Sequence, residues 1–139
     1  MNDLEPIEGL FRDGERLDPE AHLVVRGWPL TVDGLLRNAD ATRARFSLDG
    51  RPFSAISAEI TVAGWTLDMI LAGPRLRTRS RYAAVPVGEL VEAGFGLLPT
   101  FVAPHYSVVL APYTSERVQQ LLDVLGESQI NPRHVRRQP

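Results

Sequence analysis

Apolar residues recur along this chain with two different periods, and these periods predict both helices and strands. One set lies at i, i+3, i+4 and i+7, the spacing of a helix face: Val118, Leu121, Leu122 and Leu125. Thr114 can cap the start of this helix and Gly126 can end it. Further helices are expected over 32–38, over 67–71 after a Thr66 cap, and over 86–93 before Gly94.

Runs of apolar and β-branched residues predict strands over 22–26, 75–84, 95–101 and 104–110. The clearest strand signal is a hairpin, because 42–48 alternates polar and apolar residues, Asp49-Gly50 suits a two-residue turn, and 51–62 returns. Strands interspersed with short helices, without strict βαβ alternation, predict an α+β fold. We expect a mainly antiparallel sheet with short helices packed on one face.

Charge is unevenly distributed along the 139 residues, which is the length of one domain. Residues 1–20 hold seven acids and two Arg, a net charge of −5, whereas the remainder carries +3. We therefore predict an acidic leader over 1–20, a single α+β domain over 21–127, and a basic C-terminal tail over 128–139.

Composition excludes several classes of function. The chain has no Cys, so a thiol nucleophile, a thiolate zinc site and a disulfide framework are all excluded. Three scattered His do not suggest a metal site, and no metal is expected. No apolar run approaches the roughly 18–20 residues that cross a bilayer, and the first residues are acidic. The expected location is the cytoplasm, with no membrane partner.

All fifteen basic residues are Arg, and four of them alternate with other residues at 75, 77, 79 and 81. In a strand, alternate side chains share a face, so these guanidinium groups would form a row spaced by roughly 6.5–7 Å. That spacing is close to the phosphate repeat of an extended nucleic acid. Arg75, Arg77, Arg79 and Arg81 are therefore the predicted phosphate-binding residues, for RNA or another phosphate-containing ligand.

A second candidate site begins at His105, where His, Tyr and Ser follow one another at the start of a predicted strand. Imidazole transfers protons near neutral pH, and a neighbouring Arg can stabilise the anionic transition state of phosphodiester cleavage. His105, Tyr106 and Ser107 are the predicted catalytic residues of a metal-independent ribonuclease that needs no cofactor. This prediction requires the four Arg and His105 to share one concavity.

The Arg-rich strand, the acidic leader and the small size resemble the stand-alone toxin domains of bacterial conflict systems. That resemblance implies a toxin-like protein, with ribonuclease activity as one expected chemistry. It also implies a partner, because such a toxin is silenced by an acidic antitoxin or inhibitor protein.

Another order of residues resembles small ADP-ribosyltransferase toxins, which use an Arg at the end of an early strand, a Ser-rich strand and a later Glu. Arg26 ends Val24-Val25-Arg26, Ser54 and Ser57 follow in the next strand, and then come Glu59 or Glu89. The alternative catalytic set is Arg26, Ser54 and Glu59, and its cofactor would be NAD. A third hypothesis is that the protein is a non-catalytic binding or regulatory module that docks through an Arg-rich face.

Overall fold

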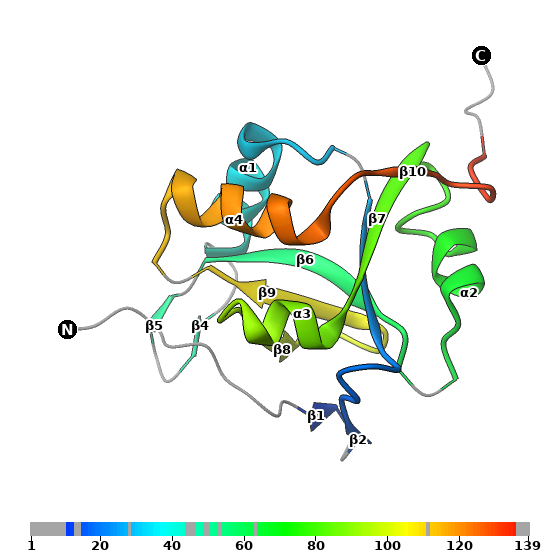
Figure 1. The fold of residues 1–139 in the computed structure, drawn as a ribbon, viewed down its shortest axis with the longest axis horizontal. Helices are drawn as coiled ribbons and strands as arrows, with labels where there is room; N and C mark the ends of the chain where they lie inside the picture. The colour runs from blue at the N-terminus through cyan, green and yellow to red at the C-terminus, as the bar shows by residue number, and fades with distance from the viewer. Residues whose placement is uncertain are drawn as a thin grey trace.

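A computed structural model describes residues 11–12, 15–27, 29–43, 47–48, 51–52, 54–62, 64–110 and 112–135. Its centre is one six-stranded sheet in which every pair of neighbours is antiparallel (Figure 1). The strands in spatial order are β10 (Gln129–Ile130), β7 (Arg81–Pro86), β3 (Leu23–Gly27), β6 (Ala55–Ile60), β9 (His105–Val109) and β8 (Gly96–Pro99). Two short pairs accompany it: β1 (Phe11–Arg12) with β2 (Glu15–Arg16), and β4 (Ser47–Leu48) with β5 (Arg51–Pro52).

Four helices complete the described fold: α1 (Val32–Arg43), α2 (Leu67–Ala72), α3 (Val87–Glu92) and α4 (Ser115–Leu125). The predicted caps are present, because the hydroxyls of Thr66 and Thr114 accept hydrogen bonds from the backbone N–H groups of Met69 and Arg117. Gly94 has φ 87°, the left-handed conformation expected of a residue that follows a helix. The predictions for α2, α3 and α4 are therefore confirmed.

The two faces of the sheet bury two different clusters, as neighbouring residues of β3 show. Val24 belongs to the large core that α1, α3 and α4 cover, through Leu35, Leu90 and Leu121. Val25 belongs to a second, smaller cluster, which α2 and the following loop cover: Val25, Ile70, Leu71, Leu76 and Tyr82. The predicted α+β class and the antiparallel sheet are confirmed, and α2 is the helix that lies on the second face.

No helix in the part of the chain that the structure describes has both the length and the apolar character needed to cross a membrane. The two arms of the predicted hairpin pair, with Leu48 opposite Arg51, whereas its turn residues Asp49 and Gly50 lie outside the described residues. Its first arm is shorter than predicted, because α1 continues to Arg43 and takes Thr42 with it. Thr42 satisfies its own hydroxyl by donating to the Asn38 carbonyl, one helical turn earlier.

The predicted strand over 75–84 is wrong in its first half. Residues 74–78 form consecutive turns, and the N–H groups of Leu76 and Arg77 donate to the Gly73 carbonyl while that of Arg79 donates to the Leu76 carbonyl. Leu76, 3% exposed, fills the second cluster, and this anchor fixes the loop. Because β7 begins only at Arg81, the expected row of four guanidinium groups does not exist.

Both predicted domain boundaries fall inside the packed structure. Leu17, which the sequence assigned to the acidic leader, is 8% exposed and belongs to the large core. At the other end, β10 lies beyond the boundary at 127 and pairs with β7, with Gln129 opposite Tyr82 and Ile130 opposite Arg81. Residues 1–10 of the leader and 136–139 of the predicted tail lie outside the described residues.

The two central strands of the sheet, β3 and β6, pair along only part of their length. Their register pairs join only Val24 with Ile60 and Val25 with Glu59, although β6 continues back to Ala55. At Ser57, the backbone N–H and carbonyl groups form hydrogen bonds with side chains and not with β3. The N–H donates to Asn38 Oδ1 at 2.7 Å, and the carbonyl accepts from Arg26 at 3.1 Å. This opening places a cleft in the middle of the sheet.

Gly27, at the end of β3, is needed because the loop after α2 crosses directly over it. A Cβ at this position would lie 2.5 Å from Leu76 Cδ2 and 3.0 Å from Arg79 Cγ. We expect Gly27→Ala to displace the loop and to lower the free energy of unfolding by about 1–3 kcal/mol, the usual cost of overpacking. Urea unfolding measures this change. An unchanged midpoint would show that the loop yields without cost.

Candidate functional site

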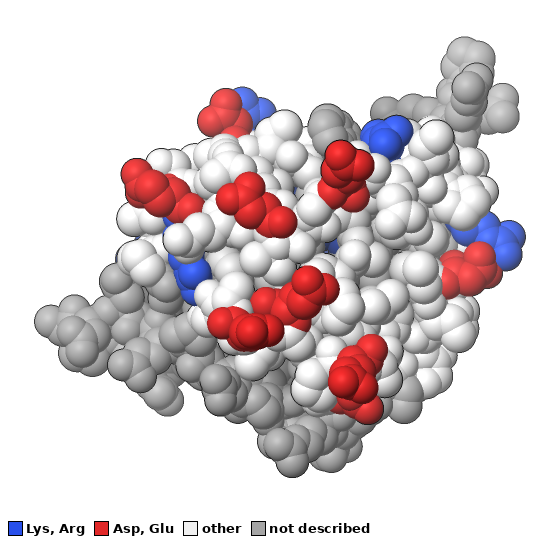
Figure 2. Space-filling view, viewed as in Figure 1, with Lys and Arg blue, Asp and Glu red and all other residues white. Residues whose placement is uncertain are grey.

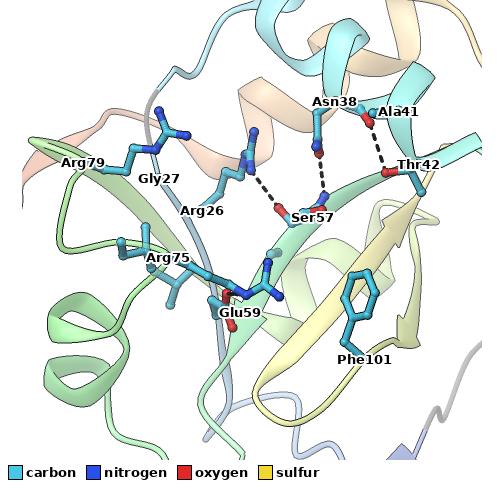
Figure 3. Close-up of a pocket in the computed structure, with 13 residues that line it drawn as sticks. Arg26, Gly27, Asn38, Ala41, Thr42, Ser57, Glu59, Arg75, Arg79 and Phe101 are labelled. Carbon is cyan, nitrogen blue, oxygen red and sulfur yellow. Dashed lines mark hydrogen bonds and ion pairs between the residues drawn. The ribbon is translucent and has the colours of Figure 1, made fainter. Parts of the chain in front are cut away.

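A cleft of about 370 Å³ opens where β3 and β6 diverge, and polar side chains from four parts of the chain surround it (Figure 3). In this view Arg26 and Arg79 lie on one side, Phe101 lies on the other, and Ser57 and Glu59 of β6 lie between them. The lining residues are Val25, Arg26, Gly27, Asn38, Ala41, Thr42, Ser57, Ala58, Glu59, Arg75, Leu76, Arg79 and Phe101. Among the described residues that line the cleft, three guanidinium groups therefore accompany one carboxylate.

Arg26 is the least hydrated of these cations. Burial, together with the positive charge of Arg79, lowers the pKa of Arg26 to about 10. One of its terminal N–H groups donates to the Ser57 carbonyl, whereas its Nε has no hydrogen-bond partner among the described residues. No described carboxylate forms an ion pair with it. Two Arg close enough to repel each other and short of negative charge make a site that an anion would stabilise.

Glu59 is buried at the floor of the cleft and holds Arg75 above it. Arg75 Nε lies 3.3 Å from Glu59 Oε1, and the side chains are 53% and 8% exposed, respectively. The Arg75 guanidinium also lies 5.6 Å from the centroid of the Phe101 ring, a cation–π distance. Glu59 and Phe101 thus fix Arg75 from two sides and place a flat cation at the mouth of the cleft.

The loop over 73–80, which carries Arg75 and Arg79, is held from below by the C-terminal segment. Asn131 is 2% exposed, and its amide Nδ2 donates to the carbonyls of Leu71, Leu76 and Arg79 at 3.0–3.3 Å. Its backbone N–H donates to the Ser80 carbonyl, and that of Val135 donates to the Arg77 carbonyl. The segment assigned to a tail therefore positions two of the three cleft cations.

The four predicted phosphate-binding Arg separate into two groups. Arg75 and Arg79 line the cleft, whereas Arg77 is exposed and does not. Arg81 does not line the cleft either, because its side chain bonds to Ser128. Its Nε donates to Ser128 Oγ at 2.8 Å, and a terminal N–H donates to the Ser128 carbonyl at 2.9 Å. The turns over 74–78 cause this separation, because side chains in turns do not alternate between two faces as they do in a strand.

The predicted catalytic group lies inside the protein and not in the cleft. His105, Tyr106 and Ser107 are each at most 1% exposed, since β9 is flanked by β6 and β8 and covered on both faces. His105 Nδ1 and Ser107 Oγ lie 2.7 and 3.1 Å from Thr100 Oγ1, and the Phe101 ring packs edge-on against the imidazole. The prediction that His105 and the four Arg share one concavity is therefore wrong.

The alternative catalytic set is brought together in part. Arg26 and Glu59 line the same cleft, and so does Ser57, the second Ser of that strand segment. Ser54 does not line it, because it is 2% exposed and its hydroxyl faces Arg43. Glu89 is exposed on α3, a helix of the opposite sheet face.

Sequence reasoning missed four residues of the site: Asn38, Thr42, Phe101 and Asn131. Both Asn38 and Thr42 lie on α1, whereas the sequence ends the predicted helix at Asn38 and begins a strand at Thr42. Phe101 is 56% exposed and adopts φ 53°, and neither property has a local signal in the sequence. Asn131 follows an expected helix end, where Asn-Pro normally indicates only a turn.

Among the described residues, no three His, Asp or Glu side chains lie close enough together to hold a metal ion. The described lining of the cleft offers Arg, amide, hydroxyl and carboxylate groups. Comparison of the chain with protein-family models, with curated proteins and with solved structures gave no match.

Proposed function

We propose that this protein binds a small phosphate-bearing ligand in the cleft between β3 and β6. The observation that carries the proposal is the charge of the cleft, where Arg26, Arg75 and Arg79 face a single carboxylate. The planar, multi-donor guanidinium group suits phosphate oxygens, and a partly buried one binds them more strongly than an exposed one. Asn38 and Thr42 add an amide and a hydroxyl to the same wall.

The size of the cleft and the distribution of charge over the molecule favour a small molecule over a polynucleotide. Its volume of about 370 Å³ is that of a small-molecule site. Acidic side chains gather on the face that α3 and α4 cover (Figure 2), where Glu89, Glu92, Glu116 and Asp123 are all exposed. A long nucleic acid needs a continuous basic surface, whereas the basic groups of this cleft are local.

Inorganic pyrophosphate tests the proposal directly. We expect Arg26→Met and Arg79→Met each to weaken its binding about 10- to 100-fold, because each removes a charge-assisted hydrogen bond worth about 1.5–3 kcal/mol. Isothermal titration calorimetry at fixed ionic strength measures the affinities. Arg77→Met is the matched control, since it removes an Arg from the same loop but outside the cleft, and it should leave the affinity within about twofold.

An equal loss of pyrophosphate affinity in all three variants would contradict binding in the cleft. It would favour a diffuse Arg-rich docking face, as in the non-catalytic module that is the third hypothesis from the sequence. Equal affinity of all variants and the wild type would reject a phosphate site altogether.

A second candidate function is the ADP-ribosyltransferase-like use of NAD, which the joint presence of Arg26 and Glu59 in one cleft favours. The Glu59→Gln variant distinguishes ADP-ribosyl transfer from phosphate binding alone. We expect this change to tighten pyrophosphate binding by about two- to fivefold, because it removes a like charge beside the phosphate. If the protein transfers ADP-ribose, the same variant should lose nicotinamide release from NAD. No nicotinamide release by the wild type would remove the second candidate.

Toxicity, an RNA substrate and an acidic antitoxin stay predictions from the sequence, as does the cytoplasmic location. The proposal gives His105 no catalytic part, because the imidazole is 1% exposed. Expression in a sensitive bacterium, with total RNA examined in wild type and in Arg26→Met, would test the toxin-like role.

A further inference from the structure

A second chamber of about 290 Å³ adjoins the cleft, and its walls are of a different chemistry. It is lined by Glu59, Trp65, Ile70, Gly73, Pro74, Arg75, Val102, Ala103 and Pro104. Seven of these nine residues carry no charge. The two charged residues, Glu59 and Arg75, are also the two that line both spaces. The ion pair therefore stands at the boundary between a cationic cleft and an apolar chamber.

The turn between β8 and β9 spans the same boundary, with Phe101 on the cleft and Val102 on the chamber. Both side chains are unusually exposed for their type, at 56% and 77%. Phe101 adopts φ 53°, a conformation that costs a bulky residue free energy and that clusters at ligand sites. The His105 N–H, which donates to the Val102 carbonyl at 3.0 Å, holds this turn in place.

The walls of the chamber suit a planar ring. Trp65 and Pro104 offer flat apolar surfaces, and Val102 adds an aliphatic one. At the boundary, the Arg75 guanidinium already lies over one aromatic ring, Phe101, and such a cation stacks equally well on a heteroaromatic ring. The Glu59 carboxylate beside it is an acceptor for hydroxyl groups.

From this continuity we propose that the two spaces form one bipartite site, whose ligand is a mononucleotide. Its phosphate lies with Arg26 and Arg79, its sugar passes Glu59 and Arg75, and its base occupies the apolar chamber. This inference rests on the proposed phosphate site and adds the ligand class. Neither space alone would select a nucleotide, because the cleft would accept any phosphate and the chamber would accept any small apolar group.

The test compares AMP, ribose 5-phosphate and adenosine as ligands of the full chain. We expect AMP to bind at least tenfold more tightly than ribose 5-phosphate, and adenosine to bind more weakly than AMP by a similar factor. A Trp28→Phe background leaves Trp65 as the single Trp of the chain. AMP should quench its fluorescence, whereas ribose 5-phosphate should not.

Two variants assign the two ends of the ligand separately. Val102→Asn changes a residue that lines only the chamber, and its exposure makes the change tolerable to the fold. It should weaken AMP at least threefold and leave ribose 5-phosphate unchanged. Arg79→Met changes a residue that lines only the cleft, and it should weaken both phosphates by the same factor.

The outcomes also separate this inference from the proposed function. Equal affinity for AMP and ribose 5-phosphate, with both weakened by Arg79→Met, would overturn the ring chamber and leave the phosphate site standing. Adenosine that binds as tightly as AMP, or no binding of either phosphate, would overturn the phosphate site and this inference with it. Urea midpoints within error of the wild type show that each variant is folded.

Discussion

Asn131→Ala should lower the free energy of unfolding by about 3 kcal/mol, a large fraction of the total for a domain of this size. The amide group is buried and serves the carbonyls of Leu71, Leu76 and Arg79 together. Alanine cannot donate to any of them, so the three carbonyl groups lose this partner inside the protein.

The same change should loosen the loop over 73–80 and weaken pyrophosphate binding, although Asn131 does not line the cleft. Urea unfolding and calorimetric titration measure the two effects. Arg133→Ala is the matched control in the same segment, because its ion pair with Asp68 joins two side chains that are each more than half exposed. It should cost less than about 1 kcal/mol. If the two variants are equally destabilised, the amide is not the group that holds the loop.

Phe95→Ala should be still more damaging, with a loss of about 3–5 kcal/mol. Phe95 is 1% exposed and enters the large core directly after α3, where its ring is a major part of the packing. Its outer face lies under Arg117, whose guanidinium carbon is 3.8 Å from the ring centroid. Burial lowers the pKa of Arg117, and no described carboxylate forms an ion pair with it.

Phe95→Leu separates volume from the cation–π contact. Leucine keeps most of the packing, so we expect a loss of less than about 2 kcal/mol. A double-mutant cycle with Arg117→Met should give a coupling of about 0.5–2 kcal/mol between Phe95 and Arg117. Additive effects would show that the guanidinium only covers the ring and does not stabilise it. Thermal or urea unfolding provides each corner of the cycle.

The elements that could be predicted are those whose signals are local. Helix α4 combines a periodic apolar face with a Thr cap and a terminal Gly, and all three agree on its bounds. The first half of the strand predicted over 75–84 is wrong, because alternation of Arg with other residues has two physical origins. A strand produces it by geometry, and a solvated loop permits it by chance. Only the contact between Leu76 and Gly27, distant in sequence, decides between them.

For the candidate site, the sequence indicates which types of side chain are present but not how the fold arranges them. The Arg-rich segment includes Arg75 and Arg79, and the order of residues around the early strands includes Arg26 and Glu59, all four of which line the cleft. The apolar run after His105 is typical of a central strand, but it does not show whether the imidazole at the start of that strand is buried or opens onto a surface. Its burial follows from the pairing of β9 with both β6 and β8. Phe101 and Asn131 depend entirely on tertiary packing.

The narrow junction between β3 and β6 has a thermodynamic consequence. Backbone pairing there is limited to Val24 with Ile60 and Val25 with Glu59, followed by the Thr61 N–H that donates to the Leu23 carbonyl, so only a short ladder joins the β10-β7-β3 half to the β6-β9-β8 half. A bound anion that contacts Arg26 on one half and the Ser57 region on the other would bridge them. Occupancy would then raise the melting temperature and protect the amides on both sides from hydrogen exchange, because the ligand binds only the closed sheet.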